Sequence, residues 1–273
     1  MPKLTTPDQV NLNYTDIGSG RPIVMIHGWP LSGAAFADNA KVLAAAGYRV
    51  ITYDRRGFGQ SGKPRDGYDY DTLAADLDAL LTGLDLHDVV LLGFSMGGGE
   101  VARYLATRGS ERVGAAILSG SICPALCITK DNPDGAMPRE GFQELADACA
   151  ADHAGFVDQF CGWFYSNDQG LTVPEEVRQQ AVEIARQSAP HAAVATILTW
   201  TEDLREDCRR IDVPLLVIHG DGDQNVPLAK SSARMPEYVP QAQLVVIEGG
   251  SHGINVSHAD QWNRTILDFL AGI

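Results

Sequence analysis

The chain has 273 residues, of which 45% are hydrophobic and 21% charged, a composition typical of a globular protein that buries a sizeable core. Its formal net charge of −14 argues against nucleic acid and anionic membranes as partners, because both favour a basic face. The first ten residues contain no apolar signal-like run, and no apolar run reaches the roughly 18 residues of a membrane-spanning helix. We therefore expect a cytoplasmic protein without a membrane segment.

The five cysteines support the same expectation, because an odd number without a signal sequence favours reduced thiols in a cytosol. Cys123 and Cys127 have the spacing C-x3-C, but no second pair of ligands follows them. We interpret them as small buried residues and expect no metal site.

Short apolar runs, most of them closed by glycine, recur along the chain, as is typical of strands buried on both faces of a parallel sheet. An alternating segment at residues 10–20 comes first and predicts an edge strand or hairpin. Buried strands are expected at residues 22–28, 48–54, 88–94, 113–120, 213–220 and 243–250. Between them, helical spacing of apolar residues predicts helices at residues 34–46, 70–84, 97–108 and 258–270. This alternation predicts an α/β fold with right-handed crossovers and a mostly parallel sheet.

Residues 121–212 interrupt the alternation, because they contain no convincing strand and hold all five cysteines. Four helices are expected there instead, at residues 139–151, 153–164, 174–187 and 190–208. We interpret this region as a helical cap inserted into a single core, which comprises residues 1–120 and 213–273.

Ser95 lies in the sequence Gly-Phe-Ser-Met-Gly, where a predicted strand gives way to a predicted helix. In this setting G-x-S-x-G is typical of a nucleophilic serine, held in a strained turn with its hydroxyl pointing outward. Gly93 and Gly97 fit the interpretation, because side chains at these positions would collide in so tight a turn. The N-terminus of the following helix favours developing negative charge. A glycine-rich turn with an incidental serine is the weaker alternative.

A serine nucleophile needs a histidine base that a carboxylate orients. In the chain order serine, acid, histidine, only His252 and His258 come late enough. The glycine-rich loop around His252 favours it over His258, which opens the last helix. Asp221 and Asp223 both follow a predicted strand. We prefer Asp223 as the acid and interpret Asp221 as a turn residue.

Two backbone N–H groups are expected to stabilise the oxyanion, that of Met96 after the serine and that of Trp29 in the loop after the first buried strand. Pro30 has no N–H and biases the backbone of Trp29 toward an extended conformation. We expect Pro30 to lie at the substrate pocket, and we hypothesise that it aims the Trp29 carbonyl into the pocket, where the carbonyl can accept a hydrogen bond from hydrogen peroxide. His27 is expected to brace this loop.

Five segments together, HGWPLSG, YDRRGFGQS, GFSMGGGEVARY, HGDGDQNVP and GGSHG, resemble the α/β-hydrolase family. More closely they resemble its branch of cofactor-free haloperoxidases, perhydrolases and aryl esterases, which includes a γ-lactamase. The resemblance implies an α/β-hydrolase fold with a catalytic triad of Ser95, Asp223 and His252, and it settles Asp223 over Asp221. It also implies oxyanion donors at Trp29 and Met96.

The resemblance further implies hydrolysis of small esters through an acyl-enzyme, without metal, haem or another cofactor. Hydrogen peroxide can then replace water and give a peracid that oxidises halide. A homo-oligomer is compatible with the resemblance. Arg55 and Arg56, in YDRRGFGQS, are expected to pair with local carboxylates rather than to bind an anionic substrate.

Asn225 departs from the family pattern, since relatives usually carry Ile, Val or Thr there. Its amide could bond a polar group of the substrate, or it could cap a helix that begins at Pro227. Trp163 and Trp200, with neighbouring aromatic residues, could line the substrate pocket or form the core of the cap. Both questions stay open at this point.

Other functions remain as alternatives. A γ-lactamase or amidase would use the same residues, and a binding protein of this fold would use none of them. A dehalogenase or epoxide hydrolase would need an aspartate nucleophile, where this chain has Ser95.

Overall fold

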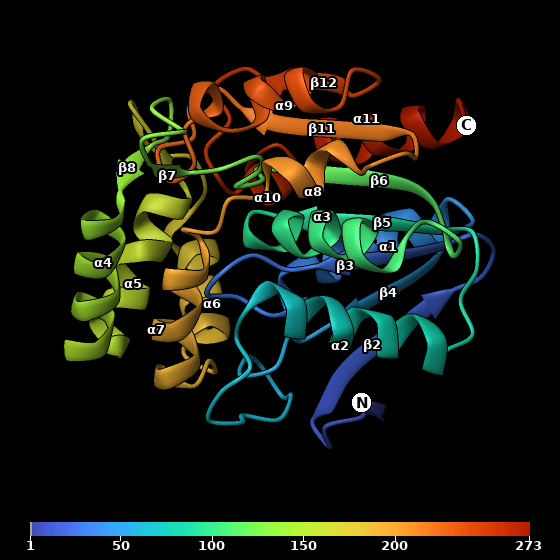
Figure 1. The fold of residues 1–273 in the computed structure, drawn as a ribbon, viewed down its shortest axis with the longest axis horizontal. Helices are drawn as coiled ribbons and strands as arrows, with labels where there is room; N and C mark the ends of the chain where they lie inside the picture. Colours follow the sequence, from blue (N-terminus) through green and yellow to red (C-terminus); the bar gives the residue numbers. More distant parts are fainter. Residues whose placement is uncertain (1) are drawn as a thin grey trace.

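An eight-stranded sheet forms the centre of the protein in the computed structural model, which describes residues 2–273 (Figure 1). The two strands at one edge are antiparallel to their neighbours, and the other pairs are parallel. The strand order is β1 (Lys3–Thr5), β2 (Asn11–Gly18), β4 (Arg49–Tyr53), β3 (Pro22–Ile26), β5 (Val89–Phe94), β6 (Val113–Ser119), β11 (Leu215–Gly220) and β12 (Gln243–Ile247). The predicted buried strands are therefore present, and β1 completes the predicted hairpin at the edge.

Helices cover the two faces of the sheet. On one face, α2 (Tyr70–Gly83) packs against α3 (Met96–Arg108), and α8 (Arg205–Arg209) packs against α3 in turn. On the other face, α1 (Ala37–Ala45) contacts α11 (Ala259–Ala271). The start of α2 shows why these helices form where they do. Asp69 caps it by accepting a hydrogen bond from the Thr72 N–H at 2.8 Å, and apolar residues at helical spacing face the core.

The helices of residues 121–212 lie side by side beyond one end of the sheet (Figure 1). These are α4 (Arg139–Ala151), α5 (His153–Phe164), α6 (Glu175–Ala185) and α7 (Pro190–Thr199), whereas α8, also in this range, packs against α3. The division of the chain into a core and this cap remains our interpretation of the arrangement.

Two expectations for this region are wrong. The helix predicted at residues 190–208 is two helices, α7 and α8, because the chain turns after Thr199 and the Leu204 N–H bonds the Pro124 carbonyl at 3.0 Å. The region also contains strands, in two ladders of two residues each that are too short to produce a sequence pattern. These are β7 (Cys127–Ile128) with β8 (Met137–Pro138), and β9 (Ser166–Asn167) with β10 (Gly170–Leu171).

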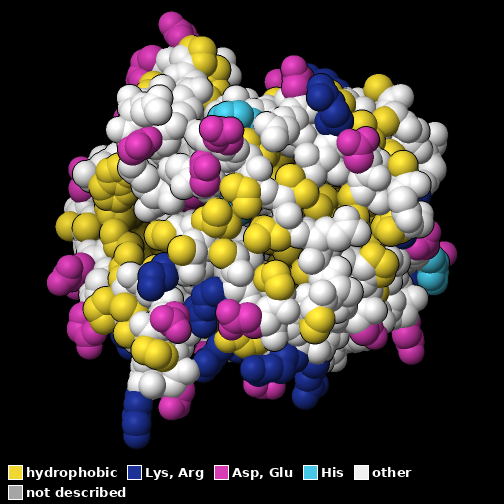
Figure 2. All heavy atoms as spheres, turned by 90° about the horizontal axis from the view of Figure 1, so that it is seen from above, with side chains coloured by type: hydrophobic (Ala, Val, Ile, Leu, Met, Phe, Trp, Pro, Cys, Tyr) yellow, Lys and Arg dark blue, Asp and Glu magenta, His cyan; other side chains and the backbone are white. Residues whose placement is uncertain are grey.

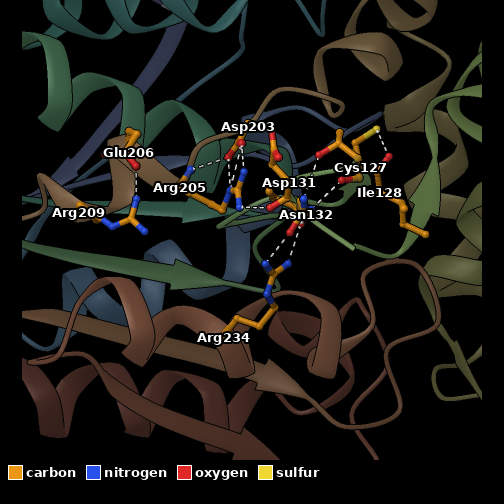
Figure 3. Close-up of polar contacts among 11 residues, drawn as sticks. Cys127, Ile128, Asp131, Asn132, Asp203, Arg205, Glu206, Arg209 and Arg234 are labelled. Atoms are coloured by element: carbon orange, nitrogen blue, oxygen red, sulfur yellow. Dashed lines mark hydrogen bonds and ion pairs between the residues drawn. The ribbon is translucent and has the colours of Figure 1, made fainter. Parts of the chain in front are cut away.

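Arginine side chains from the core and from α8 hold the beginning of the cap in place (Figure 3). Arg234, in the 3-10 turn η3 (Ser232–Arg234), donates to Asn132 Oδ1 at 2.6 Å and to the Ala125 carbonyl at 3.1 Å. Arg205, at the start of α8, donates to the Asp131 carbonyl at 2.7 Å. These contacts fix the segment through which the chain leaves β6 for the cap.

The surface carries the acidic net charge without a single concentrated patch on the face shown in Figure 2, where acidic and basic side chains lie around a more apolar middle. Within residues 2–273, the helices are all too short or too polar to span a bilayer.

Candidate active site

Ser95 occupies a strained turn between β5 and α3, with φ 54° and ψ −120°. Few residues other than glycine adopt a positive φ, so the surrounding structure must hold it. A Cβ atom on Gly93 would lie 2.4 Å from the Gly97 carbonyl oxygen, and one on Gly97 would lie 2.5 Å from the Ile26 carbonyl oxygen of β3. The expected collision is thus present, but at Gly97 the neighbouring strand causes it rather than the turn itself.

His252 and Asp223 meet at the carboxyl end of the sheet. His252 Nδ1 lies 2.5 Å from Asp223 Oδ2, and both side chains are almost fully buried. The other ring nitrogen of His252, Nε2, is buried and has no hydrogen-bond partner among residues 2–273. A neutral imidazole that donates through Nδ1 has a free lone pair at Nε2, which can accept a proton. His258, the alternative base, bonds the neighbouring Ser257 hydroxyl instead.

Asp223 is held from both sides. Its Oδ1 accepts the N–H groups of Asn225 at 2.9 Å and Val226 at 2.8 Å, and its Oδ2 lies 3.1 Å from His219 Nε2. Burial opposes ionisation, but the charge of His252 and the hydrogen bonds from His219 and His252 hold the pKa of Asp223 well below its ordinary value. The carboxylate is therefore ionised at neutral pH.

Asp221, the other candidate acid, is exposed and accepts the Gly249 N–H at 2.7 Å. It thus links the turn after β11 to the loop that carries His252, as a turn residue would.

The two predicted oxyanion donors are free. Within the described chain, neither the N–H of Trp29 nor that of Met96 donates a hydrogen bond, and Met96 is the first residue of α3. The Trp29–Pro30 peptide is cis. A free N–H at each of these positions is what an oxyanion site requires.

A buried polar network holds the loop before Trp29. His27 Nδ1 bonds the Gly28 carbonyl at 2.9 Å, and Nε2 accepts the Arg55 N–H at 2.9 Å. The Arg55 side chain donates to the His27 carbonyl at 2.8 Å and pairs with Glu100 of α3 at 2.9 Å. The network therefore ties this loop to the helix that follows Ser95. Arg56 likewise pairs with Asp76 at 2.6 Å, so both arginines have local carboxylate partners, as predicted.

A cavity of about 330 Å³ contains Ser95 and His252 in its lining. Three of the four predicted pocket residues, Asn225, Trp163 and Trp200, line it as well. The fourth, Pro30, is not among the residues that line this cavity. Pro30 is buried beside Trp29, whose indole lies against Phe160 and Trp200 and forms that part of the wall.

The structure excludes one of the two interpretations of Asn225, that it caps a helix. No side chain caps the turn that begins after Pro227, so Asn225 does not cap it. Its Oδ1 is instead buried without a hydrogen-bond partner in the described chain.

Sequence patterns missed the apolar lining residues Phe142 and Phe160. They also assigned no role to His219, although it stands four residues before Asp223 near the end of a strand.

Comparison with known proteins agrees with this geometry. The family model described as alpha/beta hydrolase fold matches residues 21–259. The chain belongs to the α/β-hydrolase fold family. Its relatives within this family include a putative non-heme chloroperoxidase of Synechocystis sp., 45% identical over 96% of this chain and 95% of the relative. A bifunctional esterase/perhydrolase of Acinetobacter calcoaceticus is 33% identical over 98% of each chain.

A solved structure, that of the bromoperoxidase from Bacillus anthracis, superposes on this chain with a TM-score of 0.96 and 39% identity, over 99% of both chains. The fold predicted from the sequence and the predicted resemblance to the haloperoxidase branch are both confirmed.

The described residues contain no cluster of three or more His, Cys, Asp or Glu side chains arranged to hold a metal ion. The five cysteines are buried free thiols.

Proposed function

We propose that the protein is a serine hydrolase that cleaves small carboxylic esters through an acyl-enzyme on Ser95. One observation carries the proposal: the buried bond between His252 and Asp223 reaches the same cavity as the strained Ser95. His252 Nε2 accepts the proton of the Ser95 hydroxyl as its oxygen attacks the ester carbonyl. The N–H groups of Trp29 and Met96 stabilise the oxyanion, and Asp223 stabilises the imidazolium.

His252 then protonates the leaving alcohol, which completes the formation of the acyl-enzyme. In the second half of the reaction a water molecule attacks the acyl-enzyme while His252 takes up one of its protons, and His252 passes this proton to the Ser95 oxygen as the acyl bond breaks. The products are a carboxylic acid and free Ser95. Each of these proton transfers uses groups of the chain itself.

Hydrogen peroxide can take the place of water in this step. Its attack on the acyl-enzyme releases a peracid in place of the acid, and the peracid oxidises bromide or chloride while it is reduced to the acid. The names of the relatives, which include esterase/perhydrolase and non-heme chloroperoxidase, support this second activity. The proposed partners of the site are therefore a small ester and hydrogen peroxide. A homo-oligomer in the cytoplasm stays a prediction.

The cavity supports a small, mostly apolar acyl group. Its volume of about 330 Å³ lies at the lower end of ligand pockets, and aromatic and aliphatic side chains form most of its wall. A lactam or amide substrate is the second candidate, and one observation favours it. The unpartnered Oδ1 of Asn225 lies at the pocket and can accept a hydrogen bond from an amide N–H.

A panel of p-nitrophenyl esters and a γ-lactam, each tested with and without peroxide, separates these functions. We expect ester hydrolysis in wild type, peracid formation with peroxide, labelling of Ser95 by a fluorophosphonate, and no change on addition of EDTA. Turnover of the lactam with little ester hydrolysis would move the assignment to an amidase. Failure of the fluorophosphonate to label would support a binding protein of the same fold.

A further inference from the structure

His219 stands at the end of β11 with its imidazole completely buried. Both neighbours of its Nε2 are acceptors: the Val226 carbonyl oxygen, with which it forms a hydrogen bond at 2.8 Å, and Asp223 Oδ2, which it contacts at 3.1 Å. Nε2 must therefore carry the hydrogen. Asp223 Oδ2 is thus shared by two histidines, His219 on one side and His252 on the other.

The second ring nitrogen identifies the form of His219. Nδ1 lies 2.7 Å from the hydroxyl of Ser232, which is also completely buried. If His219 is neutral, Nδ1 accepts the Ser232 hydrogen and every polar hydrogen of the pair has an acceptor. If His219 were charged, the Ser232 hydroxyl would have to accept, and its own buried hydrogen would lack an acceptor among the described residues. The contacts thus favour the neutral tautomer with hydrogen on Nε2.

We propose that His219 is a positioning residue for the reaction at Ser95, and that Ser232 fixes its tautomer. The inference rests on the function proposed above. The Nε2–H of His219 bonds the Val226 carbonyl and also lies against Oδ2, which it helps to hold in the place where Oδ2 receives the Nδ1–H of His252. It also stabilises the ionised carboxylate in a site that excludes water. The backbone N–H groups of Asn225 and Val226 hold only Oδ1, so without His219 the oxygen that orients His252 would have a single partner.

Two substitutions at position 219 separate this role from a packing role. His219→Gln can place an amide donor near the position of Nε2, and so can still reach Asp223. His219→Asn is shorter, and its amide reaches only the position of Nδ1, next to Ser232. We expect His219→Asn to lower kcat for p-nitrophenyl acetate by about tenfold or more, with KM within about twofold, because the donor that lies beside the charged Oδ2 is lost. His219→Gln should recover kcat to within about threefold of wild type.

Ser232→Ala tests the tautomer and has a matched control. Ser231 lies in the same turn, is equally buried, and bonds the Pro227 carbonyl at 2.9 Å rather than His219. Ser232→Ala should lower kcat several-fold, whereas Ser231→Ala should leave it unchanged. Equal losses in the two serine variants would overturn the assigned tautomer.

Proton NMR gives a readout that does not depend on turnover. The proton between His252 Nδ1 and Asp223 Oδ2, in a bond of 2.5 Å, should give a strongly downfield resonance that is absent from His252→Ala. It should shift in His219→Asn and Ser232→Ala, and stay in place in Ser231→Ala. An unshifted resonance in both variants, or equal kcat for His219→Asn and His219→Gln, would show that His219 only fills space.

The NMR resonance, measured beside the esterase activity of Ser95→Ala, separates a failure of this inference from a failure of the proposed function. If Ser95→Ala keeps the esterase activity, the proposed function is wrong, while the resonance still reports whether His219 acts on Asp223. If His219→Asn does not fold, the resonance in Ser232→Ala decides the question.

Discussion

The core end of the active site and the cap that covers it are built in opposite ways. On the core side, directional polar contacts fix each reacting group, as the two backbone N–H bonds to Asp223 Oδ1 and the short bond from His252 show. On the cap side the wall is mostly aromatic and aliphatic, and Trp163 is 38% exposed. Apolar contacts lack direction, so the cap selects a substrate by size and shape, while the core decides whether it reacts.

The largest effects should follow from changes to the reacting groups of the core. Ser95→Ala or His252→Ala should lower kcat for p-nitrophenyl acetate by about 10⁴ or more, because the two act as one unit. The melting temperature should stay close to that of wild type, since neither substitution opens a large cavity. Steady-state kinetics and a thermal melt of the same samples check both parts. A variant that keeps a tenth of the activity would remove its residue from the mechanism.

The pair of aspartates gives the next largest effect and has a built-in control. Asp223→Asn should lower kcat by about 10³–10⁴, because the amide cannot stabilise the imidazolium. Asp221→Asn should lower it less than about threefold, since Asp221 only accepts the Gly249 N–H at the exposed turn. Kinetics on both variants at one pH suffice. A larger loss in Asp221→Asn would reverse the assignment of the acid.

Changes in the cap should affect recognition rather than chemistry. Trp163→Ala removes a partly exposed wall residue and should raise KM for a butyrate or hexanoate ester by about fivefold to tenfold, because apolar contact with the acyl chain is lost. The value of kcat for acetate should stay within about twofold. If kcat for acetate fell as far as KM rose, the functional distinction between core and cap would fail.

Pro30 tests how finely the core distinguishes between nucleophiles. Pro30→Leu should lower the ratio of perhydrolysis to hydrolysis about threefold to fivefold, if the Trp29 carbonyl contributes one hydrogen bond of about 1 kcal/mol to bound peroxide. The ratio is measured as peracid formed per ester hydrolysed at fixed peroxide. Fluorophosphonate labelling of Ser95 serves as the control for acylation. An unchanged ratio would make Pro30 a rigid turn and nothing more.

The smallest effect concerns the stability of the core beside the oxyanion loop. Burial, and then the charge of Arg55, hold the pKa of His27 well below the ordinary value of 6.5. The unfolded chain takes up a proton at this residue as the pH falls below 6.5, and the native chain does not. The free energy of unfolding should therefore fall toward low pH, by at most about 1.4 kcal/mol per pH unit from this one group.

Urea unfolding of wild type and His27→Asn at pH 7 and pH 5.5 measures this contribution. The variant should be less stable at pH 7 and should lose less stability on acidification. The same pH dependence in both proteins would assign the effect to other groups.

The features that could be predicted from the sequence are those set by residues close together in the chain. The G-x-S-x-G segment predicts the turn at Ser95, because the glycines and the change from strand to helix lie within a few residues of it. It does not show that Ile26 of another strand excludes a side chain at Gly97, since that contact exists only in the folded sheet. The break between α7 and α8 is hidden for the same reason. The bond from Leu204 to Pro124 that accompanies it joins segments far apart in the chain.

Side-chain partners were the hardest part of the site to predict. The position of the two aspartates after a strand gave only a preference for Asp223 over Asp221, which the family resemblance then settled. The bond to His252 that distinguishes them physically exists only in the folded chain. The role of His219 could not be recognised in the sequence, because His219 and His27 both stand before a glycine at the end of a predicted strand. In the structure His27 braces a loop. The two differ in what the folded chain places beside them.

The strained turn at Ser95 sets a limit on how this protein can be made more robust. A backbone held at φ 54° in a residue with a side chain costs about 1–3 kcal/mol, which other contacts of the fold must offset. Glycine at this position would relieve that strain and remove the nucleophile in the same step. A substitution that raises thermal stability at this turn therefore abolishes catalytic activity. Stabilising substitutions have to be sought elsewhere, in the cap or on the surface.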